Sequence, residues 1–386
     1  MTVAPHPLAA RWEERVMRAA HPLAYPLLRA ARAPVRRVPG IGILVTDAAL
    51  LRATLMNPAS FTKTGPGSSA DLWTPVLGPS VLINMDGDDH LLLRRKLGSL
   101  FVPSYVDALV AEQLAAATAA LTRRLEGGEH VDIVAEVRHY ASMMISQLVG
   151  IDAAALNDDL FRRVSSITGF VKLSRPRLTP AQVAEARATL GELTASAGLA
   201  YRAGGDSTVP GRMRSLGLTE AEAVGAVGAF VLAATETLVS YIPRLVAVLV
   251  DSGWFAGIAA DRSLVEGAIA EGLRVTTPTP VMVRSVAAED AIGPVAVHVG
   301  ERVILATFAA NRALGPFDPE QNVASTMRQL WFGAGTHFCI GAPLAMAQIR
   351  LALSALLDVG DLRIVGRRAA RRVLIPSYSS LVVSRA

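Results

Sequence analysis

Cysteine is nearly absent from this chain, since Cys339 is the only one among 386 residues. A lone cysteine cannot form a disulfide within the chain, and it cannot build a zinc or iron–sulfur site that needs several thiolates. It can still supply one thiolate to a metal that takes a single strong ligand from the protein. The residues around Cys339 must therefore decide between a metal ligand and a small buried hydrophobe, which is the commoner role of a free cysteine.

Lysine is also scarce, because Lys63, Lys96 and Lys172 are the only three and arginine carries almost all of the positive charge. The formal net charge is +5, and no basic run is interleaved with aromatic residues. The sequence therefore does not predict nucleic-acid binding. A local basic face for an acidic protein partner stays open.

Long apolar runs are missing as well. The most apolar stretch, 223–235, lies between Glu222 and Glu236 and is shorter than the ~20 residues that a helix needs to cross a bilayer. Near the N-terminus, Arg11 and Glu13 interrupt any apolar core of a signal peptide. We therefore expect no membrane anchor and a cytoplasmic protein.

The abundant residues favour a mostly helical protein, because alanine, leucine and valine dominate an apolar fraction of 51%. Residues 1–34 predict an N-terminal arm with a short helix. Gly- and Pro-rich composition predicts a long loop between Lys63 and Gly87, which is either a functional segment or a solvated connector, and a connector over 204–211. Further patterns predict two helices within 105–150, short strands at 295–299 and 303–307, and C-terminal strands within 362–383 with a turn at 376–380.

The most informative stretch is 331–341, WFGAGTHFCIG, which contains Cys339. Gly333, Gly335 and Gly341 allow sharp turns and close approach to a flat ligand, because glycine lacks a Cβ and tolerates positive φ. Pro343 suits the first turn of a helix that we expect over 343–358. The amides at that helix start would stabilise a negative charge on the sulfur.

This stretch resembles the haem-binding loop F-G-x-G-x-H-x-C-x-G of the cytochrome P-450 family at every fixed position. The resemblance implies that Cys339 is the proximal ligand of a haem b iron and that His337 reaches a haem propionate. It also implies that Phe332 packs beside the sulfur and that Gly333 and Gly341 border the haem. The implied fold is a single domain over 1–386, mainly α with a smaller β-rich region, shaped as a triangular prism with the haem between the long central helix and the helix after the cysteine.

Three further residues match propionate-binding positions of that family. His90 and Arg94 form H-x-x-x-R on a predicted helix, where the i, i+4 spacing places both on one face. Arg95 follows directly, and Arg284 falls where relatives place another propionate arginine. A surface His–Arg pair is the alternative when the motif stands alone. A buried propionate needs such donors to offset its desolvation.

The predicted central helix begins with a capping box, Thr219 with Glu222. Residues 233–237, AATET, resemble the oxygen-activation segment A-G-x-D/E-T, so Ala233 would border the haem. Thr237 would then hydrogen-bond the oxygen being activated and Glu236 would relay protons as catalytic residues. A threonine that bonds only to its own helix carbonyls is the alternative. Two departures are Ala234, where glycine is usual, and Pro243, which should bend or end the helix.

Glu271 and Arg274 match E-x-x-R, which in the family is a buried structural ion pair. Gln321 stands where relatives commonly have an arginine that braces this pair, and Gln329 where many bacterial members have a propionate histidine. Both differences put the local bracing in doubt, and Arg328 could replace one lost contact. The substrate pocket that the resemblance implies includes Phe230, Ala234, Pro280, Val281, Met282 and Tyr378.

The implied activity is monooxygenation of an apolar small molecule, with one atom of O2 inserted and the other released as water. A composition rich in arginine and alanine is associated with bacteria that make secondary metabolites. Electrons would come from a ferredoxin and ferredoxin reductase, and Arg95, Lys96 and Arg350 are the expected docking residues. Oxidative coupling or another non-hydroxylating oxidation is an alternative. A haem-free auxiliary protein is a further one, disfavoured by the retained Cys339 and propionate residues.

Overall fold

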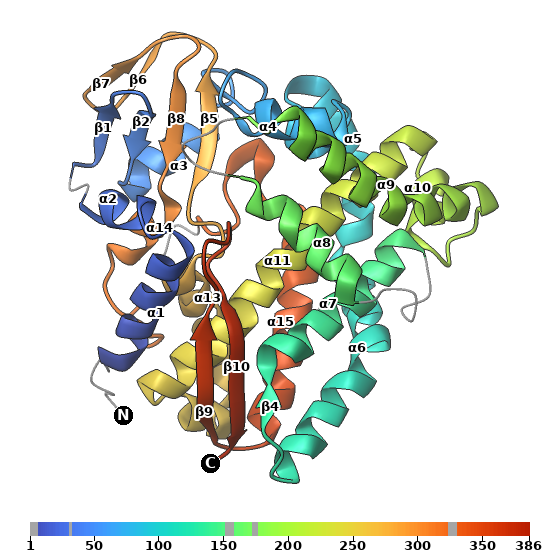
Figure 1. The fold of residues 1–386 in the computed structure, drawn as a ribbon, viewed down its shortest axis with the longest axis vertical. Helices are drawn as coiled ribbons and strands as arrows, with labels where there is room; N and C mark the ends of the chain where they lie inside the picture. Colours follow the sequence, from blue (N-terminus) through green and yellow to red (C-terminus); the bar gives the residue numbers. More distant parts are fainter. Residues whose placement is uncertain (1–6, 31–32, 151–157, 172–176, 323–329) are drawn as a thin grey trace.

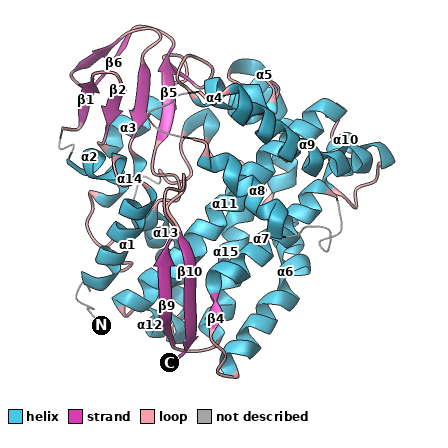
Figure 2. Cartoon of the chain, in the orientation of Figure 1, coloured by secondary structure: helices cyan, strands magenta, loops and turns pink. Residues whose placement is uncertain are grey.

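The computed structural model describes residues 7–30, 33–150, 158–171, 177–322 and 330–386 (Figure 1). Most of the chain is helical, as composition predicts, and Figure 2 shows the strands gathered at one corner and along one lower edge. The longer helices are α1 (Pro7–Ala20), α5 (Gly87–Gly98), α6 (Pro103–Glu126), α7 (Ile133–Val149), α8 (Asp158–Gly169), α9 (Pro180–Ala203), α11 (Glu220–Ser252), α13 (Val265–Thr276) and α15 (Ala342–Asp358). The shorter ones are α2 (Ala24–Ala30), α3 (Ala48–Met56), α4 (Ser69–Leu77), α10 (Val209–Ser215), α12 (Phe255–Ala260) and α14 (Thr307–Arg312), with 3-10 turns η1 (Leu82–Asn84), η2 (Ser99–Phe101), η4 (Arg262–Leu264) and η6 (Gly335–His337).

The described strands form three sheets. The largest has the order β1-β2-β8-β5-β3, in which only β2 and β8 run parallel. A second sheet has the order β4-β10-β9 and the third pairs β6 with β7. The bounds are β1 (Val35–Val38), β2 (Gly42–Val45), β3 (Phe61–Thr62), β4 (Val131–Asp132), β5 (Met282–Val286), β6 (Asp290–Ile292), β7 (Val295–Val297), β8 (Arg302–Leu305), β9 (Leu362–Ala369) and β10 (Tyr378–Arg385).

Helix α11 runs through the middle of the molecule and contacts α1, α7, α9, α13 and α15 (Figure 1). The predicted capping box is present, with Thr219 and Glu222 bonding each other's backbone amides. Pro243 does not end the helix, which continues to Ser252. Residues 238–249 are all buried, so tertiary packing on every side outweighs the single hydrogen bond that proline removes.

The two loops predicted from glycine and proline content differ from the structure. Helix α4 lies inside the predicted 63–87 loop, with Pro75 in its last turns, and helix α10 begins inside the predicted 204–211 connector. Thr208 caps α10 by accepting from the Gly211 amide, and Pro210 occupies the first turn, where it costs no hydrogen bond. The strands β7 and β8 follow one another but join different sheets.

The N-terminal segment is packed against the core. Glu13 on α1 is 2% exposed and forms a 2.5 Å ion pair with Arg244 of α11, which is fully buried. Arg312 on α14 contacts the same carboxylate at 3.3 Å. Breaking one partner of such a pair leaves a buried charge uncompensated, so this contact fixes α1 against the central helix.

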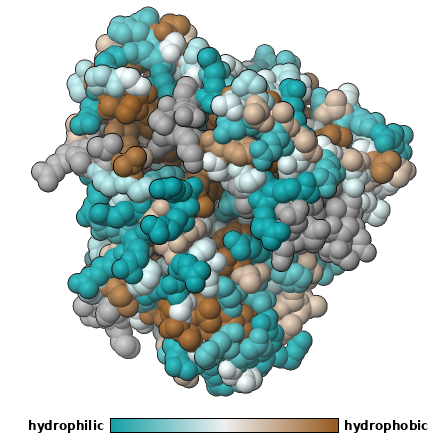
Figure 3. All heavy atoms as spheres, in the orientation of Figure 1, coloured by the Kyte–Doolittle hydropathy of each residue, from teal (hydrophilic) through white to brown (hydrophobic). Residues whose placement is uncertain are grey.

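Helix α11 is the one described helix that is long and apolar enough by itself to cross a membrane, and α5 with α6 qualifies only if that bent pair is counted as one span. Over half of the apolar window of α11 lies inside the fold. The apolar length of α11 is therefore explained by its central position. Figure 3 shows apolar side chains scattered among hydrophilic ones on the visible face.

Candidate active site

The cysteine loop has an internal hydrogen-bond frame. The Cys339 amide donates to the Phe332 carbonyl at 2.8 Å, and the Phe338 amide donates to the Gly335 carbonyl at 3.0 Å. Gly335 has φ +67°, and a Cβ there would lie 2.6 Å from the Leu55 carbonyl oxygen. A larger residue at 335 would therefore clash with backbone, which explains the glycine.

Gly341 was predicted to allow a sharp turn with positive φ, but its φ is −82°, an angle that any residue can adopt. It is the N-cap residue of α15, and Pro343 lies in the first turn as expected. Burial raises the pKa of the Cys339 thiol, while the amides of Gly341 and Ala342 and the charge of Arg94 act in the opposite direction. The loop thus offers a thiolate some stabilisation before any metal is considered.

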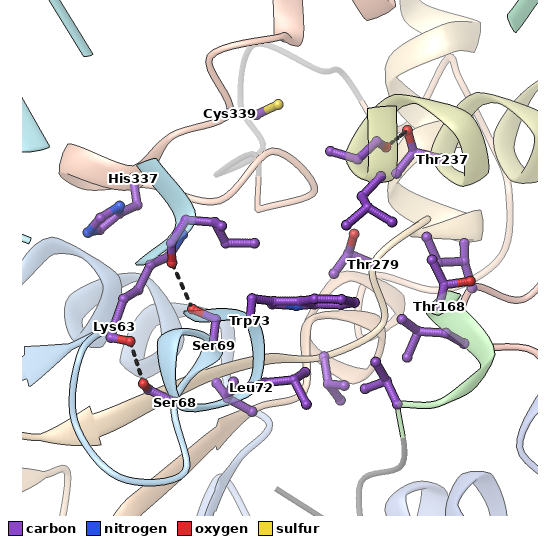
Figure 4. Close-up of a pocket in the computed structure, with 18 of the residues that line it drawn as sticks. Lys63, Ser68, Ser69, Leu72, Trp73, Thr168, Thr237, Thr279, His337 and Cys339 are labelled. Carbon is purple, nitrogen blue, oxygen red and sulfur yellow. Dashed lines mark hydrogen bonds between the residues drawn. The ribbon is translucent and has the colours of Figure 1, made fainter. Parts of the chain in front are cut away.

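The Cys339 side chain is exposed to a cavity of about 440 Å3 (Figure 4). Of the predicted pocket residues, Phe230, Pro280 and Val281 line the cavity, as does Ala233. Other wall residues that the sequence analysis did not name are Met17 of α1, His21 between α1 and α2, Tyr25 and Leu28 of α2, and Leu72 and Trp73 of α4. The segment that contains α4 was predicted as a loop, with a functional role as one alternative, and its place at the cavity favours that alternative. Nothing local to α1 signals that it borders a pocket.

Three predicted pocket residues lie elsewhere in the described structure. Tyr378 is 1% exposed and packs against Trp12 of α1 with ring centroids 6.4 Å apart. Met282 on β5 lies next to Gly333 of the cysteine loop, since a Cβ added at Gly333 would lie 3.8 Å from the Met282 Cε. Ala234 sits on α11 beside Ala233 but outside the described cavity lining. A helix or strand turns adjacent residues to different faces, and the sequence motif does not specify which face meets the ligand.

The predicted propionate residues come from three elements, α5, η6 and, with Arg284, β5. His90 and Arg94 of α5 and His337 of η6 line the cavity, and the two imidazole rings are 4.2 Å apart. Burial and neighbouring cations lower the pKa of His90 to about 4. Buried Nε2 of His90 and Nδ1 of His337 have no hydrogen-bond partner among the described residues. Unpaired buried polar atoms are costly, so these atoms indicate a missing polar ligand.

Asp86, which no sequence motif signalled, holds this cluster together. Its carboxylate accepts hydrogen bonds from His337 Nε2, from the Thr62 hydroxyl, and from the Lys63 amide at 2.6 Å. Burial alone would raise the pKa of Asp86, but these bonds outweigh it and the pKa falls to about 2. Asp86 therefore stays ionised and orients the His337 ring.

Arg284 and Arg94 supply positive charge to the same region. Arg284 on β5 is 4% exposed, and burial lowers its pKa to about 10. Burial also lowers the pKa of Arg94, whose guanidinium donates to the Phe338 carbonyl at 2.6 Å. Arg284 is buried and Arg94 is half-buried, and cations withdrawn from water in this way are stabilised by a nearby anion; the Asp86 carboxylate is already engaged by three hydrogen bonds.

Thr237 borders the cavity while Glu236 does not belong to the described lining (Figure 4). The Thr237 hydroxyl donates to the Ala233 carbonyl at 2.9 Å, which is the helical back-bond that the sequence left open as an alternative. Its oxygen can still accept a hydrogen bond from a group in the cavity. Glu236 is half-buried one residue before it.

The predicted structural pair is buried and fully bonded. Arg274 bonds both Glu271 oxygens, at 2.6 and 2.5 Å, and donates to the carbonyls of Asn311, Gly315 and Pro316. Gln321 does not brace it. Instead, the Asp318 amide and the Asn322 side chain each donate to Glu271 Oε1 at 2.9 Å, so the doubt raised by Gln321 is resolved. Arg328 and Gln329 lie outside the described residues.

The site thus combines one thiol aimed into a cavity, unpaired imidazole nitrogens and an excess of positive charge. A planar metal cofactor with two carboxylates satisfies all three features, because the metal takes the thiolate and the carboxylates take the donors. The described residues contain no cluster of three histidine, cysteine or carboxylate side chains that could hold a bare metal ion. The fold and site define a haem-thiolate protein.

Comparisons with known proteins agree. Residues 259–364 match the family model described as cytochrome P-450. Cytochrome P-450 107B1 of Saccharopolyspora erythraea is 31% identical over 296 residues, which cover 74% of this chain and 71% of that protein. The C-19 steroid 1alpha-hydroxylase of Sorangium cellulosum is 28% identical over 291 residues, 72% of this chain and 73% of that protein.

Solved structures share the fold. P-450BioI in complex with an acyl carrier protein ligated with hexadec-9Z-enoic acid matches with a TM-score of 0.81 at 20% identity, over 97% of this chain and all of that one. A mutant of P-450 EryK in complex with erythromycin B matches with a TM-score of 0.78 at 20% identity, over 99% of this chain and 98% of that one. The chain belongs to the cytochrome P-450 family. It is a bacterial haem-thiolate monooxygenase whose cofactor is haem b.

Proposed function

We propose that this cytochrome P-450 oxidises an apolar small molecule, an intermediate of secondary metabolism, in the cytoplasm. The observation that carries the proposal is the wall opposite the cation cluster. It is formed by apolar side chains such as Phe230, with Leu72 and Trp73 labelled in Figure 4, and Thr168 and Thr279 add two hydroxyls. Such a wall excludes water and selects ligands by shape. The relatives that act on a steroid or bind erythromycin B support a substrate of this class.

Each part of the site then has a role. Haem, when bound, supplies oxygen activation, and Cys339 would hold its iron through the thiolate. His90, Arg94, Arg284 and His337 would bind the propionates. Thr237 would accept a hydrogen bond from a water or another proton donor in the cavity. Glu236, which is half-buried on α11, would relay protons to that site. The apolar wall would keep other water away.

We expect Thr237→Ala to lower product formed per O2 consumed by about tenfold to a hundredfold, because proton delivery loses its positioned oxygen. O2 uptake should continue with release of peroxide. The measurement is parallel quantification of product, peroxide and O2, with a ligand selected by spectral titration. Thr237→Ser keeps the hydroxyl and should restore coupling. Unchanged coupling in the alanine variant would mean that Thr237 serves only the helix.

Electrons would come from a ferredoxin and its reductase. Of the expected docking residues, Arg350 is engaged by Glu266 through two hydrogen bonds of 2.6 and 2.8 Å. The Lys96 amine donates to the Gly217 carbonyl at 3.0 Å. Arg95 is exposed at the end of α5 and forms no ion pair with the described residues, so it is the strongest of the three candidates.

Reversing the charge with Arg95→Glu should therefore weaken ferredoxin binding about tenfold at low ionic strength, with a smaller effect in high salt. Binding can be measured by titration of the oxidised proteins. Arg11→Glu is the matched control, because Arg11 is exposed on α1, far from α5 (Figure 1). Equal affinities for the two variants would remove Arg95 from the docking face.

The direct test of the proposed function is the absorbance of the dithionite-reduced protein with and without carbon monoxide. A strongly red-shifted Soret band is expected, and compounds from apolar natural-product classes should then shift the ferric spectrum. Absence of haem would support the auxiliary-protein alternative. Spectral binding followed by a coupled rather than a hydroxylated product would support oxidative coupling.

A further inference from the structure

Lys63 is a half-buried lysine at the cavity wall, next to the predicted propionate residues but absent from every motif. Its side chain lines the same cavity as His90, Arg94 and Cys339. Protein surrounds it, and burial, reinforced by Arg284, lowers its pKa to about 7. A cationic side chain that is withdrawn from water on a cavity wall needs a negative partner, so the position of Lys63 needs an explanation.

The backbone of Lys63 is fixed at both ends. Its amide donates to Asp86 Oδ2 at 2.6 Å, and its carbonyl accepts from the Ala70 amide at 3.1 Å and from the Ser68 hydroxyl. Figure 4 shows Lys63 and His337 on one side of the cavity, with Thr237 and Thr168 on the other. The side chain is therefore held on the cation-rich side and away from the apolar wall.

No carboxylate among the described residues forms an ion pair with the Lys63 amine. Asp86 is the one carboxylate of the described residues whose charge acts on it, and the Asp86 carboxylate already accepts three hydrogen bonds. Lys63, Arg94 and Arg284 are three cations facing one carboxylate. The excess is two positive charges, which equals the charge of two ionised propionates.

We propose that Lys63 is an additional haem-propionate ligand of this enzyme, completing a three-cation clamp with Arg94 and Arg284. Its ammonium group would donate to a propionate oxygen, and the charge-assisted bond would offset the burial of both groups. A carboxylate on the substrate is the other anion that Lys63 could bind, and it becomes an outcome of the test. The inference rests on the haem site described above.

The test is the rate of ferric haem transfer from the purified holoprotein to excess apomyoglobin. Loss of one charge-assisted hydrogen bond should make Lys63→Met lose haem about tenfold faster or more. Its reduction potential should also become more negative, because removing a nearby positive charge favours the ferric state. Lys63→Arg keeps the charge and should stay close to wild type in both measurements.

Lys96→Met is the matched control for haem loss, since it removes a lysine charge from α5 at a position outside the cavity lining. Far-UV circular dichroism and the reduced carbon monoxide spectrum verify that each variant folds with its thiolate ligand. Haem loss and potential equal to wild type in Lys63→Met would overturn the proposal. If Lys63→Met kept its haem but bound lauric acid more weakly than wild type, while binding the methyl ester of lauric acid equally well, Lys63 would be reassigned to a substrate carboxylate. Failure of every variant and of wild type to take up haem would instead reject the proposed function.

Discussion

Replacing Cys339 with serine is expected to abolish the red-shifted Soret band of the reduced carbon monoxide complex and to reduce product formation by about a thousandfold, or ~4 kcal/mol of barrier. Serine has nearly the same shape, so the hydrogen bond from residue 339 to the Phe332 carbonyl should persist. Its hydroxyl does not ionise near neutral pH and is a poor ligand for haem iron. The two readouts, spectrum and turnover, should therefore fail together.

Thr336→Ala is a suitable control because Thr336 lies in η6 of the same loop and has no assigned part in the site. It should retain the band. Haem content, measured by pyridine haemochromogen, separates loss of the ligand from loss of the cofactor. A serine variant that kept the red-shifted band would show that another residue holds the iron.

Removing Glu271 is expected to destabilise the folded protein by about 3–5 kcal/mol, because Glu271→Ala leaves Arg274 charged and unpaired inside the fold. Arg274 is 1% and Glu271 0% exposed, so water cannot replace the lost contact. Asn322 and the Asp318 amide lose their acceptor in the same variant. Urea unfolding of the holoprotein, followed by circular dichroism and haem absorbance, measures the effect.

Glu266→Ala provides the matched comparison, since Glu266 also pairs with an arginine, Arg350, through two hydrogen bonds. That pair is exposed, with side chains about half accessible to solvent, and its loss should cost about 1 kcal/mol or less. Similar losses for the two variants would mean that the Glu271–Arg274 pair does not stabilise the core as its burial implies.

Much of the site was predictable because its chemistry is encoded in short spacings. His90 and Arg94 share a face because of the helical repeat, and Glu271 and Arg274 meet for the same reason. The cysteine loop is likewise a continuous stretch, and its helix began within one residue of the prediction. Local geometry alone brings such residues together.

Residues that act across long separations could not be predicted in this way. Asp86 and His337 meet although 251 positions separate them. Asn322 braces Glu271 from 51 positions away, in a segment where Gln321 suggested weakness. The sequence predicts a loop where α4 forms, because proline and glycine are frequent in that segment. The apolar residues of α4 pack along the cavity only in the folded protein, and this contact favours the helix.

The sequence by itself determined the thiolate loop, the capped central helix, the buried ion pair and hence the family. These features depend on residues a few positions apart, whose relative placement the backbone fixes. Only the tertiary structure decided which residues of α1 and α4 wall the cavity, that Tyr378 packs against Trp12, and that Lys63 joins the cation cluster. Those outcomes depend on which surfaces pack together and on charges brought close from distant elements, and a linear pattern does not contain either.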